Sequence, residues 1–99
     1  MNEEKQPTQI KLEVKIRDDL ASGRYTNMAI AHHNDSEFIL DFVFVQPQAP
    51  RAEVAARIIM SPRNLKRTVR LLEDRLAHYE KLFGEVSTPS APAPESTYH

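Results

Sequence analysis

A long amphipathic helix between residues 62 and 83 is the feature that most constrains how this chain of 99 residues folds. Ser61 is a favoured N-cap residue, and Pro62 fits the first helical position because its missing amide hydrogen has no partner there. Gly84 is expected to end the helix in a left-handed conformation. Within these bounds six apolar side chains recur at intervals of 4, 3, 4, 3 and 4 residues: Leu65, Val69, Leu72, Leu76, Tyr79 and Phe83. This apolar stripe predicts one helical face that must be buried.

Two interpretations account for the apolar stripe. It packs either on the domain's own sheet or, as an a/d seam held for about three heptads, on a neighbouring helix. Leu71 and Leu82 lie beside the stripe and make the apolar surface wider than one sheet face needs. Their position favours a helix that packs on its own sheet with one face and on a neighbouring helix with another. We therefore expect the stripe, Leu71 and Leu82 to form an oligomer or partner interface.

Strands are predicted for the part of the chain that precedes the helix. Residues 10–17 alternate strictly between apolar and charged side chains, which is typical of a half-buried strand. Asp18 to Gly23 then predicts a turn or short loop. A second strand is expected from Tyr25 to His32, with Met28 and Ile30 on its inner face.

The third predicted strand, 38–45, is apolar on both faces and therefore suits the centre of a sheet. The polar cluster 33–36 before it predicts a hairpin turn. Pro47 and Pro50 bracket the loop after it. A fourth strand is expected over 54–60, although the sequence of 52–56 is also compatible with the start of a helix.

These elements predict an α+β fold, a four-stranded antiparallel β-meander followed by one long C-terminal amphipathic helix. The expected single domain covers residues 9–86. Residues 1–8 and the Pro-, Ser- and Thr-rich residues 87–99 are expected to be disordered tails. A folded part of this size supports only a marginal core, and such domains often stabilise themselves by forming oligomers.

Composition removes several classes of protein. There is no cysteine, so disulfides, thiolate metal sites and a cysteine nucleophile are excluded. The longest apolar runs fall far short of the roughly 18 residues of a membrane span. The first residues are polar and carry acids, which is unlike a secretory signal. We expect a cytoplasmic protein that does not enter a membrane.

The net charge of −1 conceals a basic segment. Residues 51–75 hold seven basic and three acidic side chains, net +4. Four of the basic residues fall in the first two turns of the predicted helix: Arg63, Lys66, Arg67 and Arg70. Positive charge there opposes the helix dipole at a cost of about 0.3–1 kcal/mol per charge. The basic residues either contact phosphates or an acidic partner, or they form an ordinary solvated face partly paired with Glu73 and Asp74.

No arrangement of residues predicts catalysis. His32 and His33 are adjacent, so in a strand their imidazoles point to opposite faces and cannot readily share an ion; we interpret them as polar turn residues. Asp41 interrupts the apolar third strand and needs a buried partner, for which Arg57 is the candidate. The two glycines form no phosphate-binding loop. We expect no enzyme activity, no cofactor and no metal.

The chain resembles the DUF3467 family of short uncharacterised bacterial and archaeal proteins. The resemblance rests on Tyr25–Ile30, Ser36–Phe42, Arg57–Pro62 and Tyr79–Val86. It implies no activity, because none is assigned to the family. A looser, purely architectural likeness is to the SecB-type export chaperones, which place a four-stranded antiparallel sheet before a long helix and assemble through both.

Two functional hypotheses follow from the sequence. The first is a non-enzymatic, homo-oligomeric module for protein binding or assembly, with a chaperone-like role as one form of it. The alternative is a nucleic-acid-associated, DNA-binding protein that uses the basic first turns of the helix.

Overall fold

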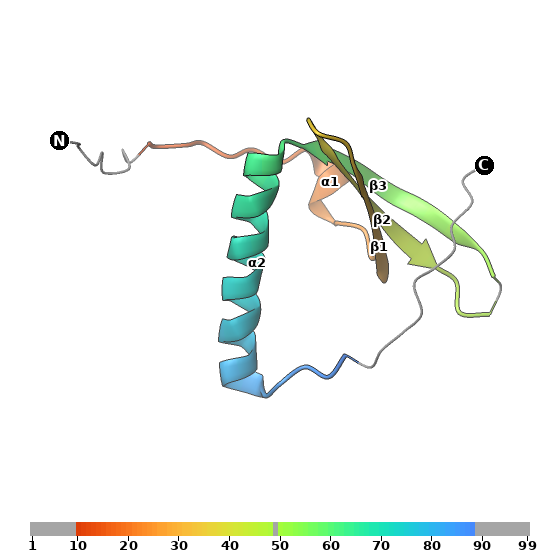
Figure 1. The fold of residues 1–99 in the computed structure, drawn as a ribbon. Coiled ribbons are helices and arrows are strands. Elements are labelled where there is room, and N and C mark those ends of the chain that lie inside the picture. Colours follow the sequence, from red (N-terminus) through yellow and green to blue (C-terminus); the bar gives the residue numbers. More distant parts are fainter. Residues whose placement is uncertain (1–9, 49, 89–99) are drawn as a thin grey trace. The chain divides into compact units, whose positions relative to one another are not determined.

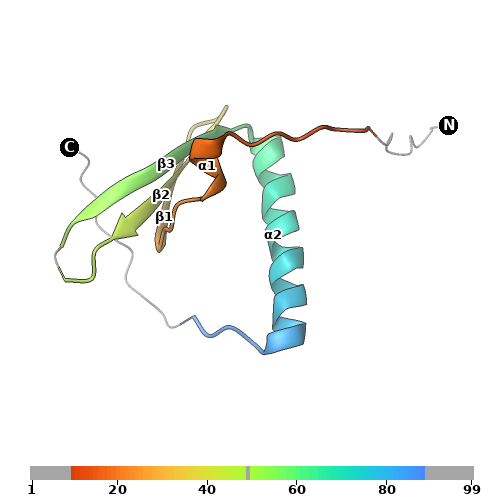
Figure 2. The ribbon, with the colours of Figure 1, turned by 180° about the vertical axis from the view of Figure 1, so that it is seen from behind.

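The computed structural model describes residues 10–48 and 50–88. Its elements are α1 (Asp18–Ala21), β1 (Met28–His33), β2 (Phe38–Val45), β3 (Ala52–Met60) and α2 (Pro62–Phe83). The strands form one three-stranded antiparallel sheet in the order β1-β2-β3, with β2 in the middle in both Figure 1 and Figure 2. The described residues fall into two compact units, 10–30 with 41–57 and 31–40 with 58–88. The predicted α+β class with a long C-terminal helix is confirmed.

The strand predicted over residues 10–17 is not formed, so the structure contains three of the four expected strands. A strand is held by hydrogen bonds to a neighbour, and in the described part of the chain this segment has no strand beside it. Its apolar side chains are 64–85% exposed: Ile10, Leu12, Val14 and Ile16. A sequence that alternates apolar and charged residues is therefore suited to a half-buried strand, but it does not form one without a neighbouring strand.

Helix α2 has the predicted bounds. Ser61 adopts an extended conformation and its Oγ accepts a hydrogen bond from the Asn64 amide at 3.1 Å. At the other end Gly84 has φ +102° and ψ 161°, so its φ is positive as expected but it lies outside the left-handed helical region. The Gly84 amide still donates to the Glu80 carbonyl at 2.9 Å, and the Glu80 carboxylate accepts from the Val86 amide at 2.9 Å.

The remaining strand bounds differ from the predictions at their ends. β2 agrees fully, whereas β1 begins at Met28 rather than Tyr25. β3 begins at Ala52, so the helical alternative for 52–56 is wrong. Antiparallel pairing with β2 gives these alanine-rich residues a neighbour, which overrides their local preference for a helix. The predicted tail 1–8 and residues 89–99 of the predicted tail 87–99 lie outside the described residues. The single domain over 9–86 stays a prediction.

Side-chain amides hold both ends of β1. The Asn27 side chain donates to the Val45 carbonyl at 3.0 Å and accepts from the Val45 amide at 2.8 Å, so it pairs with β2 as a backbone peptide would. Beyond the other end, the Asn34 side chain accepts from the amides of Ser36 and Glu37 at 2.8 and 2.9 Å. This confirms the predicted turn before β2.

Only Val43 and Asp41, both on β2, are buried among the described residues. The Asp41 carboxylate is fully buried and accepts two hydrogen bonds from the Arg57 guanidinium of β3, at 2.7 and 2.9 Å. The predicted Asp41–Arg57 pair is thus confirmed. A bidentate pair satisfies the carboxylate that an apolar strand would otherwise leave without compensation.

We expect Arg57→Met to destabilise the protein by about 2 kcal/mol, because a buried carboxylate that loses its partner keeps its desolvation cost. Half of the Arg57 side chain is exposed, so this value lies below that of a fully buried pair. The double variant Asp41→Leu with Arg57→Met should recover most of the loss. Urea unfolding at one fixed protein concentration measures all three, and an unchanged Arg57→Met variant would contradict the role of the pair.

Candidate functional site

Helix α2 presents its apolar stripe to solvent. The helix contains no buried residue, and Leu65 is the one stripe member that is half-buried. The other five are 44–71% exposed: Val69, Leu72, Leu76, Tyr79 and Phe83. At the end of the stripe the rings of Tyr79 and Phe83 lie 5.0 Å apart between centroids, one turn apart along the helix. The stripe is thus a continuous apolar surface that the described chain leaves open.

Leu71 and Leu82 widen this surface on one side. Both are exposed, at 54% and 63%. At 100° per residue they lie close together around the helix axis and roughly 100° away from the centre of the stripe. The helix therefore carries two apolar faces. One is the stripe of six residues, and the other consists of Leu71 and Leu82. All eight residues of the predicted interface lie on this helix, and their role in an interface stays a prediction.

The basic residues form a third face of α2. Arg63, Lys66, Arg67 and Arg70 are exposed and fall within an arc of about 100°, on the side of the helix opposite the stripe. The structure records no ion pair from any of them to another described residue. The pairing with Glu73 and Asp74 that the solvated-face interpretation includes is therefore not seen among the described residues, and the first turn of the helix contains no acid. Four exposed positive charges therefore lie close together at this end of α2.

The described histidines lie in two different elements, His32 and His33 in β1 and His78 in α2. His32 and His33 are the last two residues of β1, so the predicted end of this strand at His32 is one residue short and the interpretation of the two histidines as turn residues is wrong. The His33 ring packs against Phe38, with 5.0 Å between centroids. Within residues 10–48 and 50–88 there is no group of three or more histidine, aspartate or glutamate side chains arranged to hold a metal ion.

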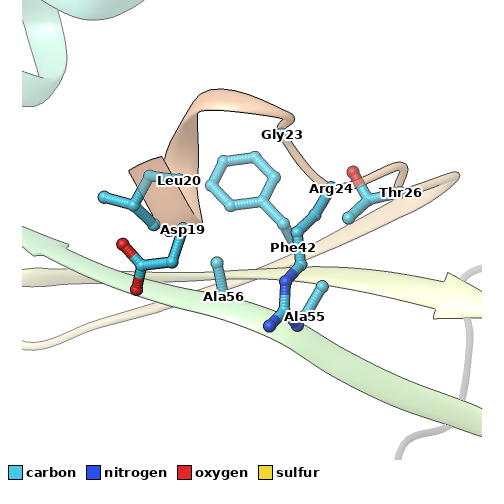
Figure 3. Close-up of a pocket in the computed structure, with 8 residues that line it drawn as sticks. All are labelled: Asp19, Leu20, Gly23, Arg24, Thr26, Phe42, Ala55 and Ala56. Atoms are coloured by element: carbon cyan, nitrogen blue, oxygen red, sulfur yellow. The ribbon is translucent and has the colours of Figure 1, made fainter. Parts of the chain in front are cut away.

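A groove over β2 was not predicted from the sequence. Its volume is about 360 Å³, and one wall is formed by Leu20 of α1 together with Gly23 and Arg24 of the loop from α1 to β1. Phe42 rises from β2 beneath this loop, and Ala56 of β3 lies below (Figure 3). Asp19, Thr26 and Ala55 complete the lining. The ionisable side chains of the lining are Asp19 and Arg24, and Thr26 adds a hydroxyl group.

A smaller hollow of about 320 Å³ shares Gly23, Arg24 and Ala55 with this groove. There the Tyr25 ring meets Phe44 edge-on, with 6.2 Å between centroids. The sequence did not predict the groove or the pairing of the Asn27 side chain with Val45, which we call the Asn27 clamp. Both depend on how the loop before β1 crosses the sheet. The asparagine directly before an apolar strand was the one local signal available.

The chain belongs to the DUF3467 family, whose description is "protein of unknown function". The family model matches residues 1–88, which is most of the chain. This confirms the resemblance seen in the sequence. The comparisons with curated proteins and with solved structures give no match. Among the described residues, no helix combines the length and apolarity that a membrane crossing requires.

Proposed function

We propose that this DUF3467 protein is a non-catalytic binding and assembly module that associates with copies of itself through the apolar faces of α2. The observation that supports this most strongly is the burial deficit. Among the described residues, one apolar side chain is buried while seventeen large apolar side chains are exposed. A chain that folds stably must remove much of this surface from water, and a second copy offers matching apolar surface.

The free energy gained by burying the stripe is similar in size to the free energy that association costs. A fully buried apolar side chain contributes about 1.5–3 kcal/mol, and the stripe residues are only about half-exposed. Roughly 1 kcal/mol from each of six residues in two copies gives about 12 kcal/mol. Association costs about 4–15 kcal/mol in lost freedom of motion. Additional apolar contact is therefore required for a tight complex.

Light scattering at micromolar concentration tests the proposal. We expect a mass of at least two chains, and a stable monomer would contradict self-association. Replacing Leu72 and Leu76 together by glutamate should dissociate the complex, because it puts four charges into a paired seam. Leu71→Glu is the matched comparison on the adjoining face. If Leu71→Glu alone also dissociates the protein with unchanged circular dichroism, then both faces of α2 make contacts between copies.

A chaperone-like role is a narrower form of this proposal. Exposed apolar patches of several hundred Å² are typical of sites that bind other proteins. The protein at a twofold molar excess should then suppress light scattering from a chemically unfolded enzyme diluted into buffer. Leu82→Glu should weaken the suppression if the side face of α2 holds the client. Suppression no better than that of an inert protein at equal mass would remove this role.

Nucleic-acid binding is the second candidate, and the exposed basic face supports it. Phosphate contacts release counterions, so affinity falls linearly on a log–log scale with salt. If Arg67 and Arg70 contact phosphates, changing both to glutamine should reduce that slope by about 1.8 for duplex DNA. Arg75→Gln with Lys81→Gln removes the same charge from further along the helix and should change the slope less. Absence of binding to DNA and RNA at low salt would exclude this candidate.

A further inference from the structure

Residues 10–17 have the pattern of a strand but no strand beside them. Their apolar side chains are Ile10, Leu12, Val14 and Ile16, and all are more than 60% exposed. The intervening side chains are Lys11, Glu13, Lys15 and Arg17. Such a segment has backbone groups that no neighbouring strand pairs and one apolar face, which are the two properties that a sheet edge complements.

The path of the chain after this segment leads away from β1. Asn27 is tied to β2 by its side chain and by its amide, which donates to the Val43 carbonyl at 3.0 Å. From there back to α1 the chain crosses the face of the sheet, so that Leu20 lines the same groove as Phe42 of β2 and Ala56 of β3 (Figure 3). Arg17, which directly precedes α1, is therefore at the end of a chain path that leads from β1 over β2 towards β3. A meander that placed 10–17 beside β1 would have to pull α1 off this face.

β3 is the edge that suits the segment in length and composition. It has nine residues against eight in the segment, whereas β1 has six. It contains no proline that would interrupt a ladder. Val54, Ile58 and Ile59 are 42–56% exposed along it. In the described sheet β3 pairs only with β2, so its outer edge is open among the described residues.

We propose that residues 10–17 of one copy add to the outer edge of β3 of a second copy, and that the exchange is reciprocal. The inference rests on the proposed self-association and names a second contact that completes it. It also accounts for the strand that the sequence predicts and the single chain does not form.

The area of this contact fits a stable dimer. Full burial of one aliphatic side chain removes about 60–120 Å² from water. Four side chains from each of two copies, with the surface that they cover on β3, bring the total to roughly 1,000–2,000 Å², the range of specific interfaces. The added strand also carries three positive charges and one negative charge, and lysine on an edge strand discourages further pairing. The exchange therefore closes in a dimer instead of continuing as a fibre.

Zero-length crosslinking of mixed isotopic copies tests the exchange directly. A carbodiimide joins a lysine to a carboxylate in contact, and Glu53 is the carboxylate of β3, while β1 contains none. After equal amounts of ¹⁴N and ¹⁵N protein are mixed and refolded, we expect crosslinks of Lys11 or Lys15 to Glu53 in which half of the peptide pairs are isotopically mixed. Crosslinks that are never mixed would show pairing within one chain and overturn the proposal. Absence of the Glu53 crosslinks would overturn it as well.

Two matched double serine variants measure how much residues 10–17 contribute to the affinity between copies. Leu12→Ser with Val14→Ser removes the apolar face and should raise the dissociation constant by about 100-fold or more. Lys11→Ser with Lys15→Ser changes the same segment on its other face and should raise it less than about threefold. Equal effects of the two double variants would overturn the exchange. A wild-type oligomer with that outcome leaves self-association through α2 in place, whereas a wild-type monomer contradicts both proposals.

Discussion

The central strand β2 carries the whole interior that the described residues possess. Both buried side chains belong to it, and one of them is the charged Asp41. The ion pair with Arg57 therefore connects β2 to β3 through the most buried atoms of the sheet. On the other side the Asn27 amide connects the start of β1 to Val45. Polar contacts thus help to fix the order and register of the strands. Most large apolar side chains of the described residues remain exposed.

This division between polar register and apolar surface has a physical consequence. Hydrogen-bonded and ionic contacts specify geometry but contribute little net stability, because water offers the same groups comparable partners. Apolar burial supplies most of the free energy of folding. A small sheet held mainly by polar contacts is therefore well defined but weakly stable alone. If the protein associates with itself as proposed, its stability therefore depends on protein concentration.

Elements whose signals are local were predicted well from the sequence. The bounds of α2 follow from Ser61, Pro62 and Gly84, each of which acts on the backbone within one turn. β2 was found because eight consecutive residues favour a strand on both faces. The Asp41–Arg57 pair was also predictable, since a carboxylate in an apolar strand needs a cation on a neighbouring strand.

Predictions failed where the outcome depends on contacts distant in sequence. Residues 10–17 have a strand pattern, yet no local signal says which strand lies beside them. The groove over Phe42 and the Asn27 clamp depend on the path of the loop from α1 across the sheet. Ala52 to Ala56 favour a helix by composition and become strand because β2 lies alongside. The helix faces of the candidate site were predictable because their periodicity is local, but their partner is not.

The opposite placement of the apolar stripe and the basic face on α2 links the two candidate functions. A copy that buries Leu72 and Leu76 against another helix must turn Arg63 and Arg67 outward, because the two faces lie on opposite sides of one helix axis. The proposed self-association would then double the number of basic faces on a single particle. Two linked sites bind a polyanion with an effective concentration that a single site lacks, so modest individual contacts become substantial together. The proposed self-association would therefore strengthen any binding of phosphates by the basic face, whereas the apolar stripe does not need the basic face in order to pair.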